Sequence, residues 1–265
     1  MAVAKGLKID LRRKRILEIL SRDGQVWVSA LAAELGTTPV TIRNDLAALG
    51  DEGYLERISG GAVKRVRGIL SNGVHSRRAE NREAKMRIAI AAAELIKDGQ
   101  TLFINSGTTT YYTALELKRH KNLNIVTNSI SVALELGDIP SFRVILLGGD
   151  INVHYSFTHG NNALEQLRQF KANKTILSMD GIHLNAGLTT YHAEEAAVNR
   201  VMMERSEETI VVADQSKLGY ESFSFVADLF SVSYLVTDLE EDEDALVVEL
   251  KRAGLRIITA AGALS

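Results

Sequence analysis

The sequence predicts an α/β protein with a small winged helix-turn-helix domain at its N-terminus and a larger, doubly wound α/β domain after it. Residues 1–66 contain three short helical patterns followed by a Gly-Gly hairpin. The later residues alternate strand-length apolar runs with helix-length amphipathic stretches, which is typical of a parallel sheet covered by helices. The charges divide in the same way, because residues 1–67 hold 12 basic and 8 acidic side chains and the rest holds 19 and 25.

Apolar spacing and helix signals predict the elements of the first domain. The second helical pattern ends at Gly36, and the pair Thr38-Pro39 gives a capping residue followed by proline at the first helical position. A bend at Gly60-Gly61 separates two short strands, which together form the wing. The expected elements are helices at residues 12–21, 27–36 and 39–49 and strands at residues 54–58 and 62–66.

The second domain is expected to begin after a polar, charged connector. We expect a first domain at residues 1–66, a linker at residues 67–85 and a second domain at residues 86–265. The strands of its sheet are expected at residues 101–105, 124–128, 143–148, 175–179, 209–213, 233–237 and 255–259. The helices are expected at residues 86–97, 109–119, 161–170, 194–205 and 244–253.

Composition excludes several classes of protein and site. The chain has 265 residues, of which 46% are hydrophobic, so it can bury a substantial core. Cysteine is absent, which excludes disulfides and thiolate metal sites, and the six histidines form no HxxxH pair, so no metal site is expected. The loop at residues 106–110 lacks both the G-x-G-x-x-G spacing of dinucleotide-binding loops and the lysine of a P-loop, so no cofactor is expected. Without a signal-peptide pattern or a run of roughly 18 apolar residues, we expect a soluble, cytoplasmic protein without membrane contact.

The basic first domain predicts a polyanionic partner. In helix-turn-helix proteins the recognition helix enters the major groove with its N-terminal residues near base edges, and arginine and asparagine pair with guanine and adenine. The alternative is a helical hairpin used only for packing, with solvated charges. The candidate DNA-binding residues are Thr38, Thr41, Arg43 and Asn44 on the helix and Arg57, Lys64 and Arg65 in the wing.

In the second domain, small polar residues follow the carboxyl ends of the expected strands, where α/β sheets bind ligands. The loop at residues 106–110 combines glycine, hydroxyl groups and a helix N-terminus, which suits a phosphate group, although hydroxyl-rich helix caps are also common. Lys217 could bind a phosphate group, and the carboxylates of Asp180 and Glu195 could accept hydrogen bonds from sugar hydroxyls. The alternative is that Lys217 lies at the surface and Glu195 on a solvated helix face. The candidate effector-binding residues are Asn105, Ser106, Gly107, Thr108, Thr109, Thr110, Thr127, Asn128, Gly148, Gly149, Asp180, His183, Glu195 and Lys217.

Both domains resemble the DeoR/GlpR family of transcription regulators. The first domain resembles it over residues 28–36, 40–46 and 55–62, although that family often has arginine where Asn44 stands and histidine where Ser59 stands. These differences bear on the operator sequence. The second domain resembles the family's effector-binding motifs at residues 104–109, 127–128, 147–149, 180–182, 187–190, 195–196 and 214–219.

The resemblance implies a second domain similar in fold to ribose-5-phosphate isomerase, and hence a phosphorylated sugar as effector. Asp180, Glu195 and Lys217 match active-site positions of the isomerase, whereas its Gly- and Lys-rich loop is replaced here by residues 187–190. This implies that ligand binding is retained and turnover is lost.

The sequence therefore predicts a non-enzymatic repressor of a carbohydrate catabolism operon that a phosphorylated sugar releases from double-stranded operator DNA. A homodimer or homotetramer is expected, because symmetric half-sites match two-fold proteins. One alternative is a sugar-phosphate isomerase-like enzyme with an accessory helical domain. Another is a constitutive nucleic-acid-binding protein whose α/β domain only oligomerises.

Overall fold

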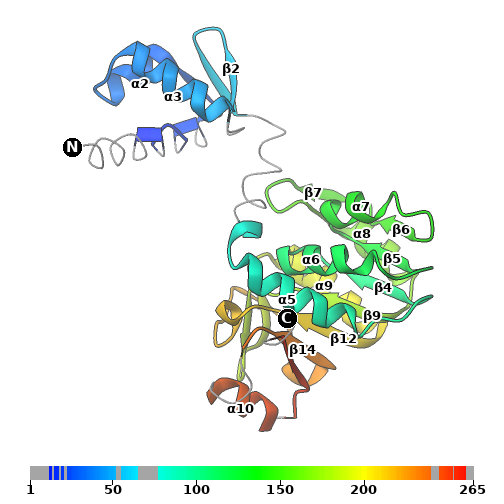
Figure 1. The fold of residues 1–265 in the computed structure, drawn as a ribbon. Helices are drawn as coiled ribbons and strands as arrows, with labels where there is room; N and C mark the ends of the chain where they lie inside the picture. The colour runs from blue at the N-terminus through cyan, green and yellow to red at the C-terminus, as the bar shows by residue number, and fades with distance from the viewer. Residues whose placement is uncertain are drawn as a thin grey trace. The chain divides into compact units, whose positions relative to one another are not determined.

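The structure is a computed structural model of the chain, which divides into two compact units, Met1–His75 and Ser76–Ser265 (Figure 1). None of the described helices has the length and hydropathy that a membrane crossing requires. Among the same residues, no group of three or more His, Asp and Glu side chains could hold a metal ion. The structure describes residues 12–13, 15–17, 19–20, 23–51, 55–64, 77–239, 245–252 and 254–260.

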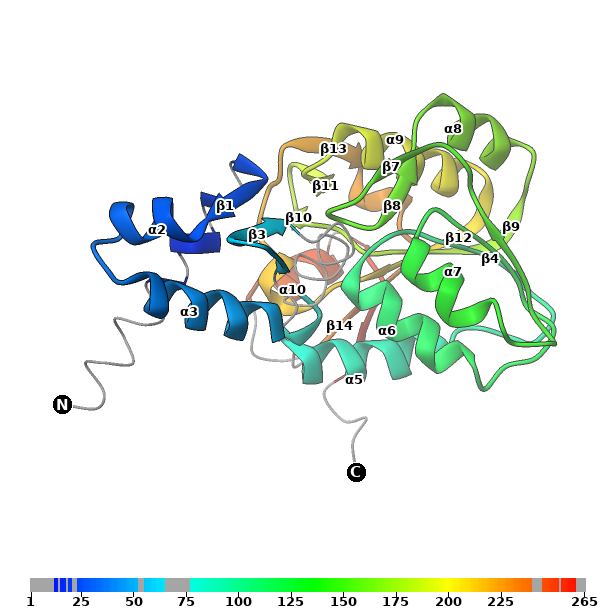
Figure 2. The same cartoon turned by 90° about the horizontal axis from the view of Figure 1, so that it is seen from above.

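The first unit is a winged helix-turn-helix. The described residues between 12 and 20 are helical, and they precede β1 (Gln25–Trp27), α2 (Val28–Glu34) and α3 (Pro39–Asp51). The wing consists of β2 (Leu55–Ile58) and β3 (Gly61–Lys64), and β1 pairs antiparallel with β3, so the sheet order is β1-β3-β2. Strand β1 was not expected from the sequence. Its main-chain pairing with the wing fixes the hairpin beside the helices (Figure 2).

Helix α3 begins where the sequence predicts, and its buried face holds the unit together. The Oγ1 atom of Thr38 accepts a hydrogen bond from the backbone N–H of Thr41 at 3.2 Å, which is N-capping geometry. Ile42, Leu46 and Leu49 form the buried stripe of the helix. Asp45 lies on the same side and is only 3% exposed.

Asp45 ties α3 to the first helical segment by charge. Its carboxylate lies 2.5 Å from Arg12 Nε and 3.3 Å from Arg13 Nε. The hydrogen bond to Asp45 raises the pKa of Arg12. Because a buried carboxylate needs such partners, these contacts fix the position of α3 within the unit.

The second unit contains a seven-stranded parallel sheet with the order β15-β14-β12-β9-β4-β5-β6. All seven strands that the sequence predicts are present in it. They are β4 (Thr101–Ile104), β5 (Asn124–Thr127), β6 (Arg143–Leu146), β9 (Ala172–Leu177), β12 (Ser206–Val212), β14 (Tyr234–Thr237) and β15 (Ile257–Thr259).

Six helices are described around this sheet. The sequence predicted five of them, but the first begins at Arg82 rather than at residue 86, and α7 was missed. Helix α7 is N-capped by Ser129, whose hydroxyl accepts from Val132 N. The helices are α5 (Arg82–Ala93), α6 (Thr108–Leu117), α7 (Ile130–Leu136), α8 (Asn161–Arg168), α9 (Ala193–Glu204) and α10 (Ala245–Arg252).

Apolar residues on the two faces of the sheet form separate cores. Along β12, Ile210 and Val212 belong to the core that α5, α6 and α7 cover, whereas Val211 belongs to the core that α8, α9 and α10 cover. This alternation is the period-2 pattern of a strand buried on both sides. The unit is therefore doubly wound, as the sequence predicts (Figures 1 and 2).

The strand order reverses between β4 and β9. From β4 the chain proceeds through β5 to β6 on one side, and from β9 it proceeds through β12 and β14 to β15 on the other. The carboxyl ends of these two adjacent strands therefore diverge into loops on opposite sides, which is the position where open α/β sheets bind ligands.

Short antiparallel strands, absent from the sequence prediction, stand beyond the carboxyl ends of the sheet. β10 (Gly181–His183), β11 (Gly187–Thr190) and β13 (Ser224–Ala227) form one sheet, and β7 (Asp150–Asn152) and β8 (Phe157–His159) form a hairpin. Two 3-10 turns, η1 (Gln215–Lys217) and η2 (Leu229–Ser231), follow β12 and β13. These pieces supply the walls around the switch point.

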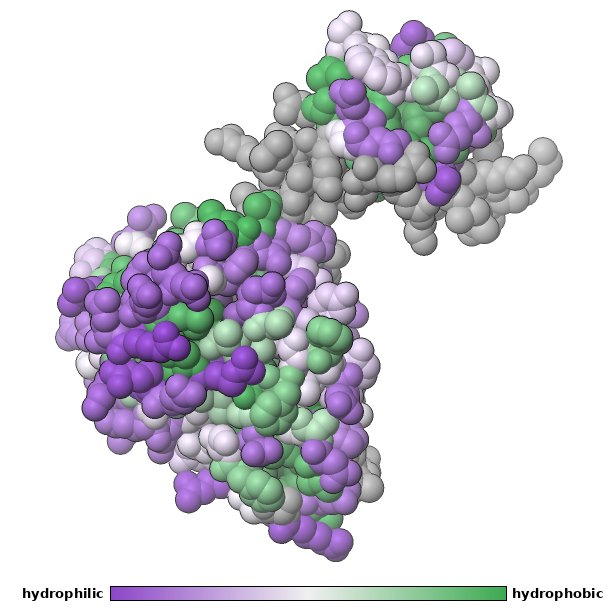
Figure 3. Space-filling model, turned by 180° about the vertical axis from the view of Figure 1, so that it is seen from behind, coloured by the Kyte–Doolittle hydropathy of each residue, from purple (hydrophilic) through white to green (hydrophobic). Residues whose placement is uncertain are grey.

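The surface of the second unit is uneven in polarity. Figure 3 shows hydrophilic residues crowded over one part of the face that it draws and apolar residues gathered over another. Several large aromatic side chains of this unit are exposed over at least half of their surface, namely Tyr191, Tyr220, Phe223, Phe225 and Phe230.

Candidate functional site

The recognition helix presents most of its predicted DNA-binding residues to solvent. Arg43 and Asn44 are exposed on α3, and Thr41 is partly exposed one turn before Asp45. Thr38 is exposed as well, while its hydroxyl caps the helix. Val40, which the sequence reasoning counted only as an apolar helix residue, is 63% exposed.

Val40 shares its exposed face with Arg43 and Asn44, because residues three and four apart are neighbours on a helix. The stripe defined by Ile42 and Leu46 could have revealed this, since Val40 lies two positions before it and so on the opposite side. An apolar side chain at this place suits the methyl group of thymine.

The wing is set by close backbone approach. A Cβ atom at Gly61 would lie 2.1 Å from the carbonyl oxygen of Val26, so only glycine lets β3 pair with β1 here. Arg57 on β2 is exposed, as a phosphate-contacting residue must be. The side chain of Lys64 and all of Arg65 lie outside the described residues.

At the switch point, Asn105 joins the ends of β4 and β9. Its Nδ2 donates to the carbonyl of Ser178 at 2.9 Å and to Oδ1 of Asn199 at 3.1 Å, and its Oδ1 accepts from Ser178 N at 2.9 Å. Asn105 is fully buried. Gly107 approaches the same strand so closely that a Cβ atom there would lie 2.6 Å from the Cβ of Ser178. These contacts hold the loop before α6 against β9.

Helix α6 begins at this loop without a side-chain cap. Thr110 turns its hydroxyl back to the carbonyls of Asn105 and Gly107, both at 3.1 Å, and Thr108 and Thr109 are buried. The first N–H groups of a helix have no intrahelical acceptor, and they carry the positive end of its dipole. The start of α6 therefore offers hydrogen-bond donors to an anion.

Two carboxylates lie beyond the end of β9 and share one hydroxyl. Thr190 Oγ1 lies 2.9 Å from Asp180 Oδ2 and 3.1 Å from Glu195 Oε2. Asp180 also accepts from the backbone N–H of Tyr191 at 2.9 Å. Burial, reinforced by the charge of Asp180, raises the pKa of Glu195 to about 8. Because a hydroxyl carries a single hydrogen, the arrangement is satisfied when Glu195 is protonated and donates to Thr190, which donates to Asp180.

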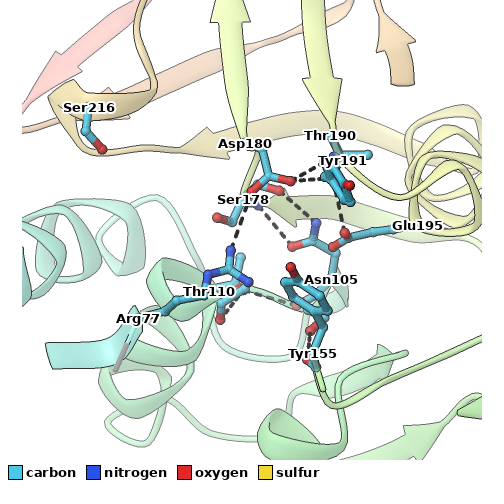
Figure 4. Close-up of polar contacts among 12 residues, drawn as sticks. Arg77, Asn105, Thr110, Tyr155, Ser178, Asp180, Thr190, Tyr191, Glu195 and Ser216 are labelled. Carbon is cyan, nitrogen blue, oxygen red and sulfur yellow. Dashed lines mark hydrogen bonds and ion pairs between the residues drawn. The ribbon is translucent and has the colours of Figure 1, made fainter. Parts of the chain in front are cut away.

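Arg77, which the sequence reasoning placed in the linker, reaches this site (Figure 4). Its Nη2 lies 3.4 Å from Asp180 Oδ1, and its guanidinium carbon lies 5.1 Å from the ring centroid of Tyr155. Tyr155 comes from the turn of the β7–β8 hairpin, and its carbonyl accepts from Ser106 Oγ at 3.1 Å. Its ring packs edge-on against His192 with the centroids 4.5 Å apart. The adjacent basic pair Arg77-Arg78 was the sequence signal for this contact.

Lys217 lies at the end of η1 and is partly exposed. The preceding Asp214 is buried and accepts from Ser216 N at 3.0 Å and from Asn81 Nδ2 at 3.2 Å, which orients the turn. Burial lowers the pKa of Lys85 on α5; Asp214 opposes this shift, and Lys217 and Arg77 add to it. Lys85, Lys217 and Arg77 therefore share an electrostatic neighbourhood with two acidic groups, those of Asp214 and Glu80.

The remaining predicted effector residues bond to other parts of the protein. Thr127 donates to the carbonyl of Ile104 at 2.6 Å, and Asn128 donates to that of Thr158 at 3.2 Å. Gly148 N donates to Gln166, and a Cβ atom at Gly149 would lie 2.2 Å from the carbonyl oxygen of His159. Asn128 and Gly149 thus contact β8 of the β7–β8 hairpin, whereas Thr127 bonds to β4 and Gly148 bonds to α8.

His183 stands apart from the switch point. It ends β10, and its Nδ1 accepts from the backbone N–H groups of Asn185 and Ala186 at 3.3 Å, so it stabilises the β10–β11 turn. Among the other candidates, one chain of contacts runs from Ser106 through Tyr155 and Arg77 to Asp180. From Asp180 it continues through Thr190 to Glu195. The effector role of all fourteen residues remains a prediction.

Comparison with known proteins assigns both units to one family. The model of the DeoR-like helix-turn-helix domain matches residues 12–65, and that of the DeoR C-terminal sensor domain matches residues 80–239. The Glycerol-3-phosphate regulon repressor of Escherichia coli (strain K12) is 33% identical over 88% of this chain and 92% of its own. The HTH-type transcriptional regulator GlpR of Haloferax volcanii is 32% identical over 93% and 96%, and the HTH-type transcriptional repressor CsqR of Escherichia coli (strain K12) is 31% identical over 93% and 94%.

Solved structures of isomerases align with part of the chain. Ribose 5-phosphate isomerase A from Methanocaldococcus jannaschii aligns with 52% of this chain and 55% of its own, at 15% identity and a TM-score of 0.38, which carries no conclusion about function. The two family matches and the full-length relatives disfavour the isomerase-like alternative. The chain belongs to the DeoR family of helix-turn-helix proteins, and it is a DNA-binding transcriptional repressor and not an enzyme.

Proposed function

We propose that this repressor controls a carbohydrate catabolism operon and leaves its operator when a phosphorylated sugar binds at the switch point of the second unit. The observation that carries the proposal is the uncapped start of α6, which lies against the end of β9 where Asp180 stands. Helix N-termini favour anions, and carboxylates accept hydrogen bonds from sugar hydroxyls.

The polar groups divide into two sets that match the two parts of a sugar phosphate. The loop of Ser106 and Gly107, the first turn of α6 and Lys217 supply donors and positive charge for the phosphate. Asp180 supplies acceptors for the sugar, and protonated Glu195 adds a carboxylic acid. A free sugar would satisfy only the second set, so the proposal requires the phosphate.

On the operator side, we propose that Arg43 and Asn44 contact base edges while Thr38, Thr41, Arg57, Lys64 and Arg65 contact base edges or the sugar-phosphate backbone. The exposure of Arg43, Asn44 and Arg57 supports these roles. The division into a DNA-binding domain at residues 1–66, a connector at 67–85 and an effector domain at 86–265 is part of the same proposal.

We also propose that the protein acts as a homodimer or homotetramer through the second unit. Exposed aromatic groups on one protein surface commonly mark an interface. Tyr191 and Phe223 flank the paired residues Thr190 and Ser224 of β11 and β13, so both stand at the same end of the antiparallel sheet.

A thermal-shift screen of the full chain tests the effector class. Ribose 5-phosphate, fructose 6-phosphate and glycerol 3-phosphate are compared with the corresponding unphosphorylated compounds. A ligand at 100 times its dissociation constant should stabilise the protein by about 2.7 kcal/mol, and Thr108→Ala should weaken its binding. The same compound should lower operator affinity in fluorescence anisotropy. Equal stabilisation by the unphosphorylated compound would show that the loop before α6 is only a helix cap.

A further inference from the structure

We infer that Arg77 binds the anionic group of the effector and that Lys85 is the residue that positions it. This inference rests on the proposed function and extends it to a residue that precedes α5 and every strand of the second unit. Arg77 lies one residue beyond the boundary between the two units. It is therefore the described effector-site residue that is closest in the chain to the DNA-binding unit.

The guanidinium of Arg77 is held loosely enough to take a ligand. Its side chain is 37% exposed, and the ion pair with Asp180 is a single contact of 3.4 Å through Nη2. A guanidinium carries five N–H donors in a planar fork that fits two oxygens of one phosphate. An incoming phosphate can thus make shorter, paired hydrogen bonds in place of one long contact.

Tyr155 connects Arg77 to the start of α6. The guanidinium lies over the tyrosine ring, while the tyrosine carbonyl accepts the hydroxyl hydrogen of Ser106. Tyr155 therefore contacts both Arg77, through its ring, and the loop before α6, through its carbonyl (Figure 4). His192 packs against the same ring, and its buried Nε2 has no hydrogen-bond partner among the described residues.

Lys85 fixes the backbone from which Arg77 extends. It is 4% exposed, and its Nζ donates to the carbonyls of Arg77 at 2.7 Å and of Glu80 at 2.5 Å. A buried ammonium group is costly unless it is bonded in this way, so the segment at residues 77–80, which is helical at residues 77–79, is held against α5. Because Lys85 Nζ donates to these carbonyls, it does not bind the anion itself but affects anion binding by positioning Arg77.

Asp180 and the anion compete for Arg77. When a sugar phosphate binds, its phosphate pairs with the guanidinium of Arg77 and its hydroxyls donate to the freed carboxylate of Asp180. Both charged groups therefore keep a partner. Inorganic phosphate binds Arg77 and leaves Asp180 beside an anion with its hydrogen bonds from Thr190 and Tyr191 but without its ion pair to Arg77. Removal of the Asp180 charge should therefore strengthen the binding of inorganic phosphate and weaken that of a sugar phosphate.

Because Arg77 lies within the connector, its change of partner acts on the chain segment that leads to the DNA-binding unit. A ligand shifts a conformational equilibrium only through different contacts in the two states. The exchange of Asp180 for the anion supplies such a difference. Arg77→Gln should then keep operator affinity and lose its response to the effector.

The test is calorimetric titration of the full chain with inorganic phosphate. Arg77→Gln should weaken phosphate binding at least tenfold, as expected for the loss of a charge-assisted paired contact, and the exposed Arg82→Gln should leave it unchanged. Asp180→Asn should tighten phosphate binding severalfold. Lys85→Met should weaken it in the wild-type background and have no further effect together with Arg77→Gln. Circular dichroism and the unfolding midpoint show that each variant is folded.

The outcomes separate this inference from the proposed function. If Arg77→Gln binds phosphate like the wild type while Thr108→Ala binds it weakly, the anion site excludes Arg77 and only the inference fails. Unchanged or weaker phosphate binding by Asp180→Asn also overturns it. If neither inorganic phosphate nor any sugar phosphate binds the wild type, both the inference and the proposed function fail.

Discussion

The hydroxyl of Thr190 lies between the carboxylates of Asp180 and Glu195. Because this hydroxyl has only one hydrogen to donate, the arrangement favours protonation of one of the two carboxylates, Glu195. With Glu195 neutral, the chain of hydrogen bonds runs from Glu195 through Thr190 to Asp180. The site then carries one negative charge next to Arg77 instead of two. A neutral Glu195 therefore favours an anionic effector, because it removes a like charge from its surroundings.

The stability of the second unit should depend on pH through Glu195. The folded protein keeps this proton up to about pH 8, whereas the ordinary pKa of the group is 4.5. Between these values the folded state binds one proton more than the unfolded state. The free energy of unfolding should accordingly fall by about 1.4 kcal/mol for each pH unit from this residue and level off above pH 8.

Glu195→Gln should remove that dependence, since glutamine keeps a donor for Thr190 and does not titrate. Urea unfolding of the full chain between pH 5 and pH 9 measures it, with the exposed neighbour Glu194→Gln as the control. Parallel stability curves for the wild type and Glu195→Gln would mean that Glu195 is ionised in the folded protein.

Arg43 is the residue on which operator specificity should depend most directly. It is exposed on α3 beside Asn44, in the part of the helix that reads base edges. Arg43→Ala should weaken operator binding by about 1–3 kcal/mol and relax the preference at one base pair. Arg57→Ala, in the wing, should weaken operator and scrambled DNA alike. Anisotropy titrations at one fixed salt concentration distinguish the two, and an equal loss on both DNAs for Arg43→Ala would contradict its role.

At the scale of elements, the junction of β4, α6 and β9 is the most constrained part of the effector unit. Gly107 is in extended backbone, so the reason for glycine is space rather than dihedral angle. A methyl group there would meet the Cβ of Ser178 at 2.6 Å and its Oγ at 2.9 Å. The start of α6 can lie against β9 only because this side chain is missing.

Gly107→Ala should destabilise the second unit by about 1–3 kcal/mol, the usual cost of overpacking, and should weaken effector binding by shifting α6. Ser178→Gly removes the atoms that the new methyl group would meet, so the double variant should recover most of the stability. Thermal unfolding and phosphate titration measure both effects. A double variant no more stable than Gly107→Ala would place the clash elsewhere, for example at Thr110 Oγ1, 3.0 Å away.

The short strands show how elements depend on their partners. Strands β7, β8 and β10 have three residues each, so no period-2 pattern is long enough to reveal them. β7 pairs with β8 and β10 pairs with β11 in short hairpins, whereas β11 also pairs with β13, where Thr190 meets the distant Ser224. Strand pairing of this kind is a tertiary interaction, and a sequence read locally does not contain it.

At the scale of the molecule, the two units have separate hydrophobic cores. The first is built around Ile16, Leu31 and Ile42, and the second unit contains the two cores on either side of its sheet. Separate cores are the physical condition for independent folding. Under the proposed function the two units are linked, because an effector that weakens operator binding must itself bind more weakly to the DNA-bound protein.

A chain that begins at Ser76 should fold, bind inorganic phosphate with the affinity of the full chain and lose all binding to DNA. The reason is that the contacts of Arg77 with Asp180 and Tyr155 lie within the second unit. Circular dichroism, calorimetry and anisotropy measure the three properties. An insoluble or phosphate-blind product would mean that the units share a core.

The sequence by itself determined the features that depend on neighbouring residues. Apolar spacing revealed the seven sheet strands, and Thr38-Pro39 marked the start of α3, since caps and periodicity act within a few residues. Residue chemistry also made Asp180 and Glu195 candidates, with a solvated helix face as the alternative for Glu195, and the family resemblance added support for both.

The tertiary structure alone decided which of those candidates meet. Arg77 and Asp180 are 103 residues apart in the chain, and Asn105 and Asn199 are 94 apart, so their contacts follow from the order of the strands. That order is set by the burial of both faces of the sheet, a property of the whole unit. It brings a basic residue from the connector into the proposed effector site, and it leaves Asn105, Thr127 and Asn128 hydrogen-bonded to the protein itself.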